Sequence, residues 1–170
     1  PVLPFDRLSG DVQWQVAGER ISVTVAQLRF ANADAQGEGQ ASWRTGDQPA
    51  HRFPGVLDLQ GSLSRANGAR VWRYLPLAVP QDARDYVRES VRQAEVSDVR
   101  FRVRGDLKDF PFPQRQGDFL VSAQVRNAHY AFAPWAVVHG AGQLPWPSLG
   151  QLSAKLVFDR SSLRVEDAQG

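Results

Sequence analysis

Cysteine and methionine are both absent from this sequence of 170 residues. The lack of cysteine excludes disulfide bonds and thiolate metal sites. The lack of methionine extends to position 1, where the chain opens on Pro1. We therefore expect the sequence to be a piece excised from a longer protein.

Long apolar runs and a strong charge of either sign are also missing. No stretch approaches the ~18 to 20 apolar residues of a membrane span, and no charged-then-apolar leader opens the chain. The formal net charge is +2, from 20 basic and 18 acidic residues. Such a balance does not indicate a nucleic-acid partner.

Motifs that carry chemistry are absent as well. The sequence has no G-x-S-x-G elbow, P-loop or dinucleotide fingerprint. His51, His129 and His139 are scattered without the spacing of a metal site, and Asp106 and Asp109 fit an ordinary polar turn. We predict no catalytic residue, no metal site and no cofactor.

The clearest periodic segment lies in the middle of the chain. Apolar residues such as Tyr86 and Val87 recur at helical spacing and predict an amphipathic helix over about residues 80–94. Asn67 is a suitable N-cap for a short helix over about residues 67–75.

Most of the remaining sequence alternates between apolar and polar residues, which predicts β-strands. A phase slip near residues 26–27 indicates a β-bulge that keeps one apolar face, and a second slip near Asn127 indicates another bulge or a turn. We count around nine strands joined mainly by short turns, so the predicted fold is mainly β (α+β), a twisted antiparallel sheet. One module is expected over residues 1–170, with a possible sub-boundary in the loop 134–149.

The apolar positions of these strands form one set, and the sheet must either fold on itself or leave part of this face open. One helix, ~10 Å wide, covers only a few strands that lie ~4.8 Å apart. The residues alone favour a closed sandwich or barrel core over an open groove. The candidate groove residues are Val12, Trp14, Ile21, Val23, Val25, Leu57, Leu59, Val99, Phe101, Val103, Phe119, Val121, Val125, Leu152, Leu156 and Phe158.

Arg100, Arg102 and Arg104 alternate with these apolar residues and line the opposite face of one strand. A row of guanidinium groups can hold phosphate oxygens. The interpretation that we favour is a solvated outer face whose arginines pair with acidic residues of neighbouring strands.

Four short segments, in this order, resemble the YhdP group of AsmA-like bacterial envelope proteins, which are related more distantly to TamB. The segments are "FDRLSGDVQW" from Phe5, "RYLP" from Arg73, "RGDLKDFPFP" from Arg104, and "WPSLGQLSAKLVFDRSSLRV" from Trp146. They are spread along the sequence, so the resemblance covers nearly the whole chain.

The resemblance implies a segment of a long periplasmic protein that is anchored in the inner membrane. It implies stacked β-units whose apolar groove carries phospholipid towards the outer membrane, and it thus favours the open groove. The expected partners are phospholipid acyl chains and neighbouring β-repeats of the same chain, and the expected role is non-catalytic. The alternative is a structural or adaptor domain that binds protein through its sheet edges or the Trp- and Pro-rich loop.

Overall fold

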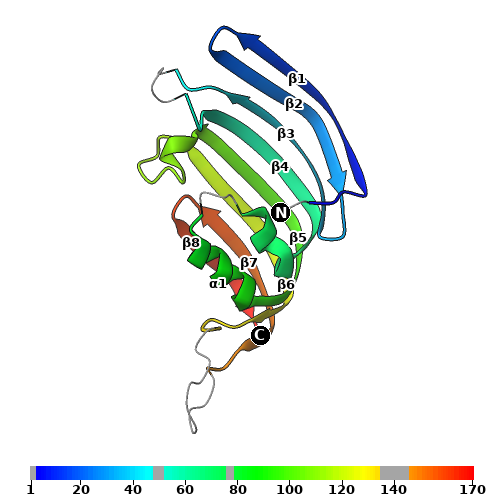
Figure 1. The fold of residues 1–170 in the computed structure, drawn as a ribbon. Helices are drawn as coiled ribbons and strands as arrows, with labels where there is room; N and C mark the ends of the chain where they lie inside the picture. Colours follow the sequence, from blue (N-terminus) through cyan, green and yellow to red (C-terminus); the bar gives the residue numbers. More distant parts are fainter. Residues whose placement is uncertain (1–2, 48–51, 76–78, 135–145) are drawn as a thin grey trace.

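A computed structural model gives the fold of the chain and describes residues 3–47, 52–75, 79–134 and 146–170. Within them, eight strands form a single antiparallel sheet in which spatial order follows chain order (Figure 1). The predicted mainly-β antiparallel fold is confirmed, with eight strands where the sequence suggested about nine. The strands are β1 (Arg7–Ala17), β2 (Arg20–Ala31), β3 (Ala35–Arg44), β4 (Val56–Asn67), β5 (Val91–Asp106), β6 (Asp118–Tyr130), β7 (Leu149–Asp159) and β8 (Ser162–Gln169).

Two helical segments follow one another between β4 and β5. The first is the 3₁₀-helix η2 (Gly68–Tyr74), which begins where the side chain of Asn67 accepts a hydrogen bond from the Ala69 N–H. This confirms the predicted short helix. The second is α1 (Gln81–Ser90), and a further 3₁₀ turn, η3 (Leu107–Asp109), follows β5.

The expectation of a helix to residue 94 is wrong in its last turn. Val91 and Ala94 belong to β5, where Val91 pairs with Tyr130 of β6. Ala94 is buried beneath η2. The sheet hydrogen bonds and this packing outweigh the helical periodicity, since helix propensity yields readily to tertiary contacts.

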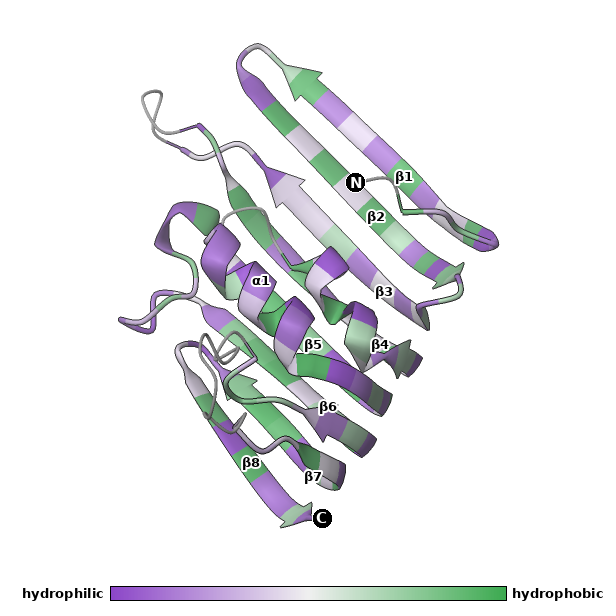
Figure 2. Cartoon of the chain, turned by 60° about the horizontal axis from the view of Figure 1, so that its bottom comes forward, coloured by the Kyte–Doolittle hydropathy of each residue, from purple (hydrophilic) through white to green (hydrophobic). Residues whose placement is uncertain are grey.

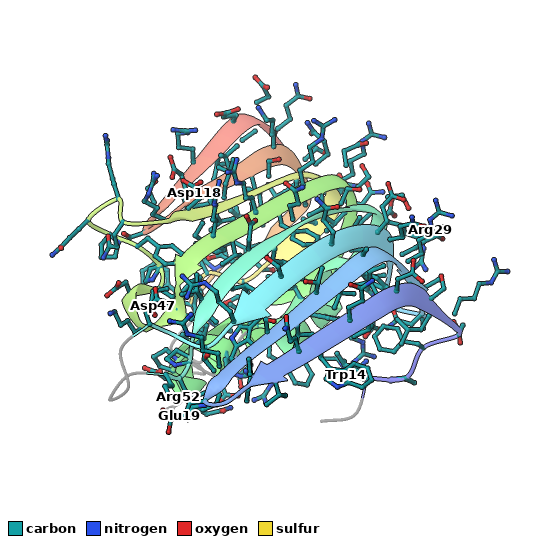
Figure 3. All side chains as sticks on the ribbon, turned by 90° about the horizontal axis from the view of Figure 1, so that it is seen from above. Trp14, Glu19, Arg29, Asp47, Arg52 and Asp118 are labelled. Carbon is teal, nitrogen blue, oxygen red and sulfur yellow. The ribbon has the colours of Figure 1, made fainter. Side chains whose placement is uncertain are left out.

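The two predicted β-bulges are confirmed. Gln27 and Asn127 adopt positive φ angles of 51° and 49°, at points where the pairing of β2 and β6 shifts register. Three other strands carry a bulge residue of the same kind, namely Asp98 in β5, Gln151 in β7 and Asp167 in β8. Bulges bend a strand and increase its twist, and the sheet is accordingly curved (Figures 1 and 3).

The sheet is open, so the predicted alternative of a closed barrel is not what this chain forms. Strands β1 and β8 end the strand order, and no pairing between them is present among the described residues. The helical segments lie over the inner side of the curve (Figure 2). Most of the loop 134–149 lies outside the described residues, and the possible sub-boundary there stays a prediction.

Candidate functional site: the apolar face of the sheet

Apolar residues form rows that run from strand to strand across one face, which we call the apolar face (green along the strands in Figure 2). One row follows cross-strand partners from Leu28 in β2 through Gly39, Gly61, Phe101, Val121 and Phe158 to Leu163 in β8. A parallel row runs from Val12 in β1 through Val25, Ala41, Leu59 and Val103 to Phe119 in β6. Cross-strand partners share a face, so the rows form one continuous surface.

The sixteen candidate residues named from the sequence lie on this face. Trp14 and Val23 pair in one row with Trp43 and Leu57. Near the bulged ends of the strands, Val125 pairs with Ala154 and Leu152 with Ala128. Val99 pairs with Leu63 of β4. Ile21 and Leu156 complete the set through their partners Val16 and Val165.

Exposure of the apolar face rises from the centre of the sheet towards its edges. Val99 in β5 is 7% exposed, and Phe101 and Val121 are half-buried. On β1 the exposed fractions are 53% for Val12 and 73% for Trp14, and on β8 that of Val165 is 55%. Large contiguous apolar surface is unusual on a soluble protein and marks an interaction site.

Part of this face carries no side chain at all. Gly39 and Gly61 are cross-strand partners, and Phe101 pairs with Gly61 on its other side. A Cβ atom on Gly61 would lie 2.6 Å from the ring of Phe101 and 2.4 Å from the Glu38 carbonyl oxygen. Glycine is therefore required at position 61 for the ring of Phe101 to lie against the sheet. Because glycine has no side chain, the surface beside Phe101 is recessed.

The opposite face is polar and internally paired. Arg104 lies 3.4 Å from Asp58 and Arg102 lies 3.4 Å from Asp118, each on a neighbouring strand. Arg29 and Asp118 point away from the outer side of the curved sheet, whereas Trp14 lies on its inner side (Figure 3). For Arg102 and Arg104 the favoured interpretation of a solvated, charge-paired face is confirmed.

A polar cluster fastens η2 to the turn between β2 and β3. The buried Asp34 accepts hydrogen bonds from Arg73 at 2.5 Å and from the Tyr74 hydroxyl at 3.2 Å. The amide of Asn32 donates to the same hydroxyl at 3.0 Å. Burial is the main cause that raises the pKa of Tyr74. The "RY" of the "RYLP" segment thus holds η2 in place.

Helix α1 meets the end of β6 through two tyrosines. The hydroxyl oxygens of Tyr86 and Tyr130 are 2.6 Å apart, and that of Tyr86 also donates to the Phe132 carbonyl at 3.1 Å. Burial, followed by the hydrogen bond with Tyr86, raises the pKa of Tyr130 to about 12. The Tyr130 phenol is therefore protonated at neutral pH.

The opposite ends of these strands are covered by the connection from β5 to β6. Phe112 is fully buried between Gly105 and Gly117, where a Cβ atom would lie 2.8 and 2.6 Å from its ring. The ring of Phe110 packs on Phe119 with centroids 4.9 Å apart. The "FPFP" segment therefore closes one end of the apolar face.

The residues that the structure describes include no cluster of three or more potential metal ligands. His129 lies 2.9 Å from the Ser148 hydroxyl, whereas His51 and His139 fall outside the described residues. Over the same part of the chain, no helix has the length and hydropathy to cross a membrane.

The apolar face also includes residues that were not among the sequence candidates, such as Ala41, Trp43, Leu163 and Val165. Trp43 stacks on Phe53 with centroids 6.0 Å apart, and its indole N–H donates to the Pro54 carbonyl at 2.9 Å. Leu163 and Val165 pair with Phe158 and Leu156. The signal in the sequence is the same alternation, weakened in β3 by Gly37 and Gly39.

Comparison with known proteins extends these observations. The sequence is 30% identical over 117 residues to the protein named "Intermembrane phospholipid transporter YhdP" of Escherichia coli K12, a match that covers 68% of this chain and 8% of that protein. No solved structure matches the chain. The whole chain, residues 1–170, matches the family described as YhdP protein. The chain therefore belongs to the YhdP family.

Proposed function

We propose that this chain is a non-catalytic module of a phospholipid conduit, and that acyl chains contact its apolar face. The observation that carries the proposal is the continuous apolar surface from β1 to β8, which widens into exposed side chains at both edges. A face that served only as the core of this domain would be covered by a second layer.

The energetics of hydrophobic contact with the apolar face are compatible with lipid transport. Each buried methylene contributes ~0.8 kcal/mol, so a tail is held without any specific partner. Because hydrophobic contact is not directional, a lipid can move from one row of residues to the next without losing a fixed set of hydrogen bonds.

The E. coli relative supports the proposed cargo and place of action. Its name describes it as an intermembrane phospholipid transporter. We infer that the protein carrying this chain is likewise periplasmic, anchored in the inner membrane, and carries phospholipid between the inner and outer membranes. Because the chain spans 8% of that relative, it represents one segment of such a path.

The edge strands β1 and β8 can pair with the strands of neighbouring β-units. The outer backbone groups of β1 and β8 have no strand partner among the described residues, and long unpaired apolar edges favour pairing with further strands. We infer that neighbouring β-units of the same chain continue the apolar face there.

Two adjacent residues of β6 provide a matched test. Val121 lies on the apolar face, and Leu120, on the polar face opposite Arg102, is 43% exposed. Val121→Asp places an unpaired carboxylate in the proposed lipid path at a cost of several kcal/mol. We expect it to abolish photo-crosslinking of phospholipid to the intact protein and to weaken the envelope, whereas Leu120→Asp has little effect.

Far-UV circular dichroism and the denaturation midpoint serve as controls that each variant is folded. Phe101→Asp is a second variant on the same face. A folded Val121→Asp or Phe101→Asp protein that crosslinks phospholipid as well as its parent does would refute the conduit. The unpaired edges of β1 and β8 would then favour the alternative function, an adaptor domain of the envelope.

A further inference from the structure

The two helical segments over the apolar face are attached to the sheet in different ways. Segment η2 lies directly on β5, because a Cβ atom on the buried Gly68 would lie 2.6 Å from the Cβ of Ala94 and 3.2 Å from a methyl of Val96. The pairing of Arg73 and Tyr74 with Asp34 also fastens it to the turn after β2. Segment η2 is thus a fixed part of the fold.

Helix α1 is attached through polar side chains along its length. The Arg84 guanidinium donates a hydrogen bond to the Leu75 carbonyl at 2.9 Å. The Tyr86 hydroxyl binds the Tyr130 hydroxyl and the Phe132 carbonyl, and the Arg88 guanidinium lies 5.9 Å from the centre of the Trp72 ring. Tyr86 and Val87 are only half-buried, and Ser90 is the one residue of α1 that is fully buried. A helix of ten residues is marginal in isolation, so weak docking allows it to open locally.

The closed position of α1 also contains an unfavourable feature. The hydroxyl of Ser90 is buried and has no hydrogen-bond partner among the described residues. A buried unpaired hydroxyl destabilises the state that buries it. Ser90 is the last residue of α1, next to the point where the chain enters β5.

The location of α1 matters if lipid moves along the apolar face. On β5 and β6, Ala94, Val99 and Ala128 are 7 to 8% exposed, whereas Trp14 on β1 is 73% exposed. Helix α1 and η2 lie over this central part of the sheet (Figure 2). An acyl chain moving from the β1 edge to the β8 edge must therefore pass the strands that the helices cover.

We propose that α1 is a hinged cover that opens beside Ser90 to let acyl chains pass β5 and β6, and that the Tyr86–Tyr130 hydrogen bond is its latch. The role of this cover in lipid transport rests on the proposed conduit function. The motion of α1 depends on the fold alone. Segment η2 stays in place while α1 moves.

The motion is tested by hydrogen exchange of the intact protein. We expect amides of α1 to exchange faster than those of η2 and β5. Tyr86→Phe and Tyr130→Phe each remove one hydroxyl of the latch, and each should speed exchange in α1 about three- to tenfold. Tyr74→Phe, the matched control on η2, should leave exchange in α1 unchanged.

The role in transport is tested by locking the cover. The chain has no cysteine, so Tyr86→Cys with Tyr130→Cys can be joined by a short bismaleimide that spans the space vacated by the two phenol rings. We expect the bridged protein to transfer labelled phosphatidylethanolamine between phosphatidylethanolamine–phosphatidylglycerol vesicles at least tenfold more slowly than the same variant without the bridge.

The two tests separate the cover from the conduit. Amides of α1 that exchange as slowly as those of β5, or do not respond to Tyr86→Phe, would overturn the cover. A bridged protein that transfers lipid at the parental rate would overturn it as well. If the unmodified parent neither binds nor transfers lipid, the conduit fails, and the exchange data alone decide whether α1 opens.

Discussion

Asp34 joins two distant parts of the chain, since its partner Tyr74 lies 40 positions further along the sequence. Its side chain is 11% exposed and that of Arg73 is 23% exposed. Removing one member of a buried ion pair leaves the other charge without its partner, which is strongly destabilising. The segment "RYLP" is thus explained by a tertiary contact.

We expect Asp34→Ala to lower the free energy of unfolding by about 3 kcal/mol, measured by urea denaturation. The matched control is Asp47→Ala, which removes an exposed partner of Arg44 and should leave the midpoint in place. Equal midpoints for the two variants would show that Asp34 does not hold η2 on the sheet.

The strands and two of their bulges, at Gln27 and Asn127, could be predicted from the sequence because both leave a local pattern. In β2 the apolar residues change from odd to even positions at Gln27, and a single extra residue restores the face. The end of α1 could not be predicted in this way. Val91 and Ala94 fit the helical period as well as the strand, and the contact of Ala94 with Gly68 decides between them.

The docking of α1 on β6 should depend on pH through Tyr130. Its pKa in the fold is about 12, above the ordinary value of 10, because the site is buried and the hydroxyl binds Tyr86. Between these values the folded state holds the proton and the unfolded state releases it. The stability contributed by the protonated phenol is therefore complete below pH 10 and is lost as the pH rises towards 12.

We expect the urea midpoint to fall between about pH 10 and about pH 12, and to fall less in Tyr130→Phe, which has no proton to lose. The difference between the two slopes isolates Tyr130 from other groups that titrate in this range. Parallel slopes for parent and variant would contradict the raised pKa.

The apolar face as a whole could be foreseen only in part. Alternation identified the sixteen candidates, but their register across strands is tertiary information, as is the exposure of Trp14 and Val165. The glycines show the limit most clearly. Gly39 and Gly61 weaken a strand pattern, yet they form the floor beside Phe101 because only glycine fits there.

If the face is continuous in function as well as in geometry, lipid contact should alternate along every strand. We expect a photo-crosslinking amino acid at Trp14 on β1, Leu59 on β4 or Val165 on β8 to capture phospholipid in cells that make the intact protein. The same amino acid at the adjacent positions Gln13, Gln60 and Arg164 should not, because neighbouring residues of a strand point to opposite faces. Capture at Leu59 but not at Trp14 and Val165 would confine lipid to the centre of the sheet. Equal capture at both members of each pair would mean that lipid does not follow the apolar face at all.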